Sequence, residues 1–341
     1  MTLPRSKIVD PEVTRWYHCI SRCVRQAFLL SNDSDEFHRK DWLESRLREL
    51  DSIFAVSVAG YSFMDNHLHL LLRIEPDIAK SWSPVEVARR WLTLYPPRVN
   101  RKKVVASQED IERLAQNTEW VEEKRNRLVS LGWFMKCLKE PLARLANREE
   151  HRHGTFFEGR FKSIAILDEE SILTVAAYID LNPVAARICS LPEQSPHTSI
   201  HDRVEHVVTT GRVSDVQQIR NGSVPAQQVS EGLEDDHWLI PIEDRRAQGA
   251  SREGIQAGFT LGQYLMLVDC MSRCMREGKA HVEQHVASIF DRIAMDAQRI
   301  ADRVQSMLQR PRFYGSFLAA TREGIRRAAA RLGVNRLVST A

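Results

Sequence analysis

The chain has 341 residues, of which 43% are hydrophobic, so it is long enough for two domains, or for one domain with appendages. Its net charge of +3 excludes a nucleic-acid-binding surface made by bulk charge, and any such surface must come from local clusters. No apolar run reaches the ~20 residues of a membrane span, and the start of the chain lacks the apolar core of a signal peptide. We therefore expect a cytoplasmic protein with no membrane partner.

Hydrophobic periodicity predicts a chain of alternating strands and helices. Strands are expected at 16–24, 54–63, 67–74 and 156–167, and helices at 35–50, from Pro84, at 131–146 and at 168–183. Residues 95–130 are expected to form an insertion in this pattern. The order strand-helix-strand-strand-helix-strand predicts an α+β fold of the ferredoxin-like or RNA-recognition-like type, with an antiparallel sheet. Such a fold supports many functions, so the function must come from particular residues.

Two histidines one residue apart, His67 and His69, lie on the strand expected at 67–74. Side chains at i and i+2 of a strand point to the same face, so both imidazoles face one way. Leu68 and Leu70 then face a core on the other side. Two imidazoles on one face of a sheet supply half of a metal site. The pair by itself is equally compatible with structural histidines.

The segment that ends at Pro183 has the features of a helix. Asp168 is a suitable N-cap, and Pro183 marks the expected end. Tyr178 and Asn182 are four residues apart, so they lie on one side of the helix. They border a stripe with the spacing of a buried helix face, made by Ile172, Val175, Ala176 and Ile179. Taken alone, the segment favours a structural interpretation, with a tyrosine at the edge of a core and an Asn-Pro pair that ends a helix.

Four motifs follow one another over roughly residues 14–190. They are WYHCISR at 16–22, FMDNHLHLLL at 63–72, HGTFFEGRFKS at 153–163 and AYIDLNPVAAR at 177–187. In order and spacing they resemble the single-tyrosine HUH transposases, specifically the REP-associated tyrosine transposases. Two features depart from that family: Ala185 stands where a further basic residue is common, and the insertion at 95–130 exceeds what a minimal catalytic domain needs. Both leave the choice of substrate open.

The resemblance implies an HUH domain over 1–195 that nicks and rejoins DNA. Tyr178 would be the nucleophile and would form a 5′-phosphotyrosine, leaving a free 3′-OH. His67, His69 and Asn182 would hold a divalent cation, Mg²⁺ or Mn²⁺. The implied substrate is single-stranded DNA next to a hairpin, of the kind that palindromic repeats form. The protein would act as a monomer or a homodimer.

Basic residues near the motifs are candidates for contacts with DNA phosphates. Those that flank the first and fourth strands are Arg22, Arg25, Arg152, Arg160 and Lys162. A second group, Arg98, Arg101, Lys102 and Lys103, clusters in the insertion. Three aromatic residues, Phe156, Phe157 and Trp133, are expected either to stack on unpaired bases or to belong to the core.

The composition changes after the last motif. Residues 196–258 are rich in Gly, Ser, Gln and Asp, which predicts an extended connector with a short ordered anchor around Trp238. Helical patterns return over 259–341. Their last helix and tail carry Arg322, Arg326, Arg327, Arg331 and Arg336, which form either a solvated helix face or an auxiliary DNA-binding surface.

Two other functions stay open at this point. The first is a non-catalytic nucleic-acid-binding module on the same fold. The second is an unrelated metal hydrolase that uses the pair His67 and His69, and it predicts no role for Tyr178. A covalent adduct between the protein and DNA would separate the transposase from both.

Overall fold

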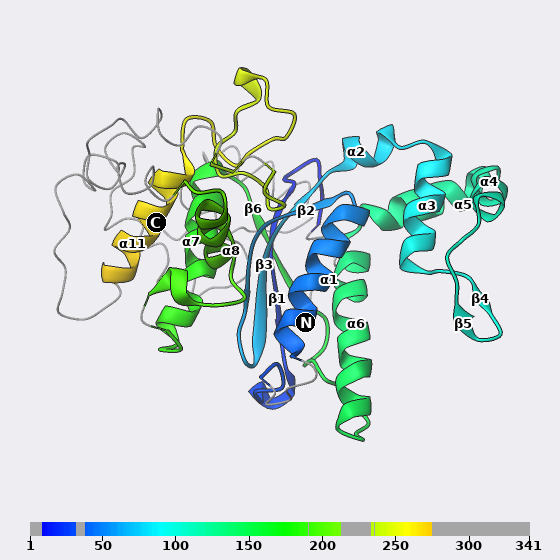
Figure 1. The fold of residues 1–341 in the computed structure, drawn as a ribbon, viewed down its shortest axis with the longest axis horizontal. Helices are drawn as coiled ribbons and strands as arrows, with labels where there is room; N and C mark the ends of the chain where they lie inside the picture. Colours follow the sequence, from blue (N-terminus) through cyan, green and yellow to red (C-terminus); the bar gives the residue numbers. More distant parts are fainter. Residues whose placement is uncertain (1–8, 32–37, 190, 213–232, 235, 275–341) are drawn as a thin grey trace, which may run out of the picture. The chain divides into compact units, whose positions relative to one another are not determined.

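The computed structural model describes residues 9–31, 38–189, 191–212, 233–234 and 236–274 (Figure 1). The chain divides into two compact units. The first unit takes the described residues of Met1–Ser21, Val58–Leu72 and Lys162–Ala341, and the second takes those of Arg22–Ser57 and Arg73–Phe161. Because the chain passes repeatedly between the units, the expected domain 1–195 contains parts of both.

Most of a four-stranded antiparallel sheet lies in the first unit. Its strands are β1 (Trp16–Arg22), β2 (Val56–Phe63), β3 (His67–Ile74) and β6 (Lys162–Ile166), in the order β2-β3-β1-β6. The first three are close to their predicted bounds. The fourth is shorter than the predicted 156–167, because Gly159 adopts a φ of 141° that interrupts the extended backbone before Lys162.

The sheet is buried on both faces along β3. Leu68, Leu70 and Leu72 are fully buried, as their alternation predicts. Leu71, which shares its face with His67 and His69, is fully buried too and belongs to the core that the sheet forms with helix α7 (Glu169–Ala185). The two histidines therefore lie on a covered face, at the edge of a hydrophobic core.

Helix α7 is enclosed almost completely. Figure 1 shows it together with α8 (Ser199–Thr209) and α11 (Leu261–Cys274) beside the strands. The expected N-cap is present, since the Asp168 carboxylate accepts a hydrogen bond of 2.9 Å from the Ser171 N–H. The expected end at Pro183 is wrong, because α7 continues to Ala185. A proline in the last turn removes one N–H donor, and packing around the helix outweighs that loss.

The described parts of 196–258 are not the extended connector that their composition predicts. The edge strand β2 is covered by this region: the Phe63 N–H donates to the His197 carbonyl (3.1 Å), and the Ile240 N–H donates to the Val58 carbonyl (2.8 Å). The ordered anchor at Trp238 is present, and its indole N–H donates to the Asp202 carboxylate at 2.7 Å. Two short 3-10 helices complete the first unit, at Pro192–Gln194 and Arg246–Gln248.

The second unit is mainly helical. Its helices are α1 (Arg39–Ile53), α2 (Pro76–Ser81), α3 (Pro84–Leu94), α4 (Gln108–Ala115), α5 (Thr118–Leu128) and α6 (Leu131–Glu149), with a 3-10 turn at Val24–Gln26. The insertion at 95–130 contains α4, α5 and a two-stranded hairpin of β4 (Arg98–Val99) and β5 (Lys102–Lys103). Ser107 and Asn117 accept hydrogen bonds from the first turns of α4 and α5 and so fix where these helices begin.

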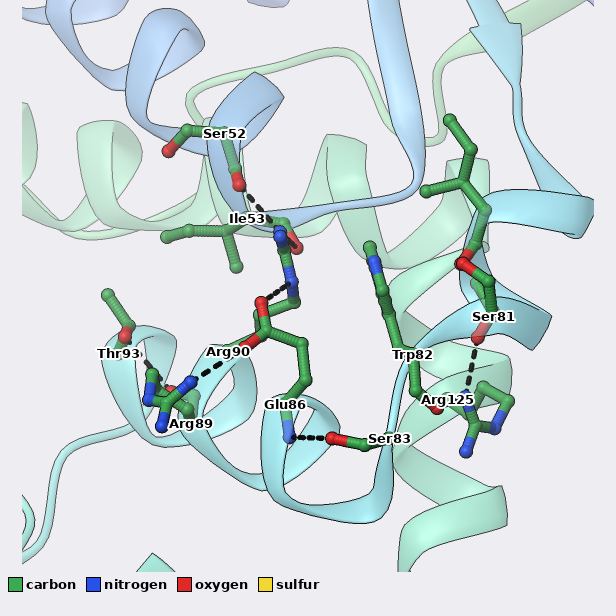
Figure 2. A network of polar contacts seen from close by, with 12 residues as sticks. Ser52, Ile53, Ser81, Trp82, Ser83, Glu86, Arg89, Arg90, Thr93 and Arg125 are labelled. Carbon is green, nitrogen blue, oxygen red and sulfur yellow. Dashed lines mark hydrogen bonds and ion pairs between the residues drawn. The ribbon is translucent and has the colours of Figure 1, made fainter. Parts of the chain in front are cut away.

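Figure 2 shows how an arginine joins two helices of this unit. The guanidinium of Arg90, on α3, donates to the carbonyls of Ser52 (2.6 Å) and Ile53 (2.9 Å) at the end of α1. The same group pairs with Glu86 at 2.7 Å and lies over the Trp82 ring at 4.2 Å. A cation at the C-terminal end of a helix satisfies its last carbonyls and its dipole. This arginine is therefore part of the fold.

Helix α11 is the described part of the expected C-terminal helical region. The expected helices after it, and the arginines between Arg322 and Arg336, lie outside the described residues. None of the helices in the described ranges is long and apolar enough to cross a membrane.

Candidate active site

Three histidines and one tyrosine come together where α7 covers the sheet. His67 and His69 lie on β3, His18 lies on the neighbouring strand β1, and Tyr178 lies on α7. The ring centroids of His67 and His69 are 4.9 Å apart, and those of His69 and Tyr178 are 5.7 Å apart. His18 is 5.0 Å from His69 and 6.0 Å from Tyr178. The structure thus places the two histidines and the tyrosine of the sequence prediction in one cluster.

The cluster extends from the core to the surface. His18 and His69 are buried, whereas His67 and Tyr178 are partly exposed. Between residues 171 and 184 of α7, the positions that are not buried are Tyr178 and Asn182. Away from its ends, the enclosed helix thus keeps its accessible surface at Tyr178, which contacts His18 and His69, and at Asn182, one turn further along.

Hydrogen bonds to the imidazoles favour particular tautomers. The His67 Nδ1 atom lies 2.5 Å from the Asn66 side-chain oxygen, which can only accept. Nδ1 of His67 therefore carries the proton, and its Nε2 carries the lone pair that a metal ion needs. Such outer partners orient histidine ligands and raise their basicity in known metal sites.

His18 lies within hydrogen-bond distance of His69. The His18 Nε2 and His69 Nδ1 atoms are 2.8 Å apart. Burial lowers the pKa of His18 to about 3, so its ring is neutral near neutral pH. One ring must donate to the other, and a lone pair on Nε2 of His69 requires that His69 donate to His18. In that arrangement His18 is an acceptor that orients its neighbour.

Asn182 lies one turn beyond Tyr178 on α7. Its side-chain N–H donates to the Tyr178 carbonyl at 2.9 Å, so the amide is held by its own helix. The structure places Asn182 beside Tyr178 but records no contact between its amide and the three imidazoles. The two β3 histidines offer a divalent ion two imidazole ligands, and Asn182 would have to exchange its helix contact to complete the shell.

The other tyrosines of the first unit have a different environment. Tyr17, Tyr61 and Tyr264 are buried. Their hydroxyls donate to the Thr14 carbonyl (2.9 Å), the Asp202 carboxylate (3.2 Å) and the Asp180 carboxylate (2.6 Å), respectively. Burial raises the pKa of Tyr17 and of Tyr264 above the usual value. Of the tyrosines described in this unit, Tyr178 is the one with an accessible ring.

The predicted DNA-contacting residues are all exposed, and they belong to different units. Lys162 belongs to the first unit, whereas Arg22, Arg25, Arg152 and Arg160 belong to the second. Of the two alternatives for Phe156 and Phe157, the structure shows the core, since they are 4% and 7% exposed. The ring of Trp133 contacts two cations, since its centroid is 4.4 Å from the Arg127 guanidinium and 4.6 Å from the Lys136 ammonium. The ring therefore packs against protein groups.

Reasoning from sequence missed His18, although it lies in the motif at 16–22. On an alternating strand it shares a face with Trp16 and Ile20, and Ile20 packs in the core with α7. That parity was readable from the sequence. The pairing of His18 with His69 was not, because it depends on β1 lying next to β3.

Comparisons of the chain with known protein families, with curated proteins and with solved structures find no match.

Proposed function

We propose that the protein is a metal-dependent tyrosine transposase or endonuclease that nicks and rejoins single-stranded, hairpin-forming DNA. The observation that carries the proposal is the contact of a partly exposed tyrosine on α7 with two histidines that share one face of β3. A nucleophile beside a pair of metal ligands is the minimum that phosphoryl transfer through a covalent intermediate requires.

The arrangement of elements supports an HUH domain of the ferredoxin-like type. The four strands of the sheet are the first, second, third and last of the expected order, with α1 between the first two. The order β2-β3-β1-β6 places β1 and β3 side by side in the centre. This arrangement brings His18 and His69 together, and α7, which follows β6 directly, covers them with Tyr178.

In the proposed reaction the Tyr178 hydroxyl attacks a backbone phosphorus in line. A bond forms between phosphorus and the phenolic oxygen as the bond to the 3′ oxygen breaks. The phenolic proton is released, the leaving oxygen takes up a proton, and the products are a 5′-phosphotyrosine and a free 3′-OH. Because the phosphodiester energy is kept in the new ester, attack by a 3′-OH reverses the step and joins strands without a nucleotide cofactor.

His67 and His69 would hold the divalent cation, Mg²⁺ or Mn²⁺. When bound, the ion would neutralise charge on the phosphate as the bond to tyrosine forms. Asn66 accepts a hydrogen bond from Nδ1 of His67, and in the proposed site His69 donates from its Nδ1 to His18, which would leave Nε2 of both rings for the ion. The same contacts hold the rings in fixed orientations, so the site is ordered before substrate enters.

The test uses the full chain and labelled single-stranded DNA. A hairpin flanked by unpaired bases is incubated with the protein and Mn²⁺, and a covalent adduct is sought on a denaturing gel. We expect an adduct that is lost with excess EDTA and with the variants His67→Ala and His69→Ala. A matched control is His206→Ala on α8, whose ring contacts the ring of His237.

An adduct that persists in EDTA and in the double variant His67→Ala/His69→Ala would show that the reaction does not need a metal ion. Binding of hairpin DNA with no adduct under any metal would favour the non-catalytic nucleic-acid-binding module instead.

A further inference from the structure

The β4–β5 hairpin carries an unusual concentration of positive charge. Residues 98–103 contain Arg98, Arg101, Lys102 and Lys103 and no acidic residue, and all four are exposed. Figure 1 shows the hairpin extending away from the helices of the second unit. The register pairs Arg98 directly with Lys103. Like charges opposite each other destabilise a two-stranded ribbon, so this pair of cations lowers the stability of the hairpin.

The turn of the hairpin also carries positive charge at a cost in stability. Asn100 and Arg101 both have positive φ, 52° and 66°, as a two-residue turn of a hairpin requires. Glycine is the usual residue at the second of these positions because it has no Cβ to strain. Arginine there adds charge to the tip at a conformational cost, and local strain of this kind is concentrated at functional sites.

The hairpin continues into a basic groove within the same unit. The groove has a volume of about 1240 Å³ and is lined by α1, the end of α3, the hairpin and α6. Its lining contains seven Arg and Lys residues but only two glutamates, Glu49 and Glu140. Arg144 and Lys136 face Glu140, and Arg46 pairs with Glu49. Among the described residues Arg98, Lys103 and Arg148 of the lining have no ion pair, so the hairpin supplies two of the three unpaired cations of the groove.

Apolar side chains accompany this charge. Val99, Val104 and Val105 are 58%, 36% and 95% exposed. The major groove of B-DNA is about 12 Å wide and admits a two-stranded ribbon, where basic side chains contact phosphates and guanine edges and apolar ones contact thymine methyls. Single-stranded DNA needs several open aromatic rings for stacking. Tyr95, the exposed aromatic residue of the groove, is stacked on Trp91 at 4.8 Å.

We infer that the hairpin and the adjoining groove bind double-helical DNA, with the β4–β5 ribbon in the major groove. This inference deepens the proposed function, on which it rests for the choice of DNA: the duplex would be the stem of the hairpin substrate. Duplex RNA is excluded as the preferred ligand, because its major groove is too deep and narrow for side chains to read.

The test is equilibrium binding of the full chain to a labelled DNA duplex, the matching single strand and the matching RNA duplex. We compare the wild type with the double variant Arg98→Gln/Lys103→Gln. The control is Arg89→Gln/Arg113→Gln, which removes the same charge from exposed arginines of the same unit that already pair with Glu86 and Asp110. Circular dichroism checks that both variants fold.

We expect the hairpin variant to lose ~10-fold or more in affinity for the DNA duplex at ~100 mM salt, and its salt slope to fall by roughly 2. The control should change by less than about 3-fold. Equal losses in the two variants, or wild-type preference for single-stranded DNA or duplex RNA, would overturn the inference. The outcome is independent of cleavage: duplex binding that depends on the hairpin, without any adduct, keeps this inference and rejects nicking.

Discussion

Helix α7 carries two polar clusters on opposite sides, and they differ in how far their hydrogen bonds are satisfied inside the protein. Tyr178 and Asp180 are two residues apart, which turns their side chains by roughly 200° around the helix. Tyr178 is partly exposed and contacts the rings of His18 and His69. Asp180 is buried and accepts hydrogen bonds from three groups, Ser199 Oγ (2.5 Å), the Ile200 N–H (3.0 Å) and Tyr264 Oη (2.6 Å).

The difference separates a site for chemistry from a device for folding. Around Asp180 the network is closed, since the neighbouring Arg203 donates to the carbonyls of Ala59 (3.0 Å) and Ile240 (2.8 Å) and pairs with Glu234. Closed polar networks hold a unique arrangement of segments. The histidine cluster instead reaches the surface, from the buried His18 and His69 to the partly exposed His67 and Tyr178. A polar cluster that is ordered yet accessible is the one to test for activity.

The largest expected effect comes from replacing the tyrosine of each cluster, one at a time, with phenylalanine. Tyr178→Phe should lower adduct formation by about a thousandfold or more, because the nucleophilic oxygen is gone, while unfolding free energy changes by less than ~1 kcal/mol. Tyr264→Phe removes a hydrogen bond to a buried carboxylate and should cost about 1.5–3 kcal/mol with cleavage retained. Gel assays and denaturant unfolding of both variants measure the contrast. Equal behaviour of the two would erase the distinction between the clusters.

The next effect is the loss of stability when the closed network is opened. Asp180→Ala leaves the Ser199 and Tyr264 hydroxyls and the Ile200 N–H without their acceptor, and it should cost about 3–5 kcal/mol. Asn182→Ala, two residues further along α7, removes a hydrogen bond at a partly exposed position and should cost under ~1.5 kcal/mol. Urea unfolding compares the two. If Asn182→Ala is the more harmful, the assignment of the clusters is reversed.

Much of this arrangement was predictable from sequence, for physical reasons that differ by region. The alternation of β3 predicted that His67 and His69 share a face, and the spacing of α7 predicted that Tyr178 and Asn182 do. The role of Asp180 was not predictable, because its partners Ser199 and Tyr264 come from regions whose composition indicated a connector and a separate helical part. In the described parts of these regions, polar side chains such as Ser199, Arg203 and Tyr264 are buried in hydrogen bonds, and composition does not distinguish burial of this kind from solvation.

The insertion at 95–130 shows a second limit on what can be predicted from sequence. Its helices follow from ordinary N-caps at Ser107 and Asn117. The β4–β5 hairpin has only two residues in each strand and lacks the Asn-Gly signal of a tight turn, so no period of hydrophobic residues marks it. Its charge cluster was visible in the sequence, but the pairing of Arg98 with Lys103 required the structure.

The closed network should also respond to pH. Burial raises the pKa of Asp180 to about 6, so the folded chain holds a proton that the unfolded chain releases at lower pH. Stability from this group is present below the unfolded pKa of about 3.9 and is lost as pH rises through about 6. Between about pH 5 and about pH 7.5 the wild type should lose ~1.4 kcal/mol relative to Asp180→Asn. Parallel profiles in urea unfolding would show that Asp180 does not carry the shift.

The smallest expected effect concerns the orientation of a ligand. His18→Gln keeps a hydrogen-bond acceptor near His69, and we expect its Mn²⁺ affinity to fall about 10-fold or less. His18→Ala removes the acceptor, and we expect its Mn²⁺ affinity to fall about 10- to 100-fold. Calorimetric titration with Mn²⁺ measures both. The graded rescue by glutamine separates a positioning role from a structural one. Identical affinity in all three proteins would leave His18 as a packing residue.

The most direct test of the central claim is to map the covalent bond. Wild-type protein is reacted with hairpin DNA and Mn²⁺, digested with protease and nuclease, and analysed by mass spectrometry. The account predicts a nucleotide on the peptide that contains Tyr178, because that hydroxyl is accessible and adjacent to His69. A nucleotide on Tyr17 or Tyr61, whose rings are buried, would contradict the account, as would full cleavage by Tyr178→Phe.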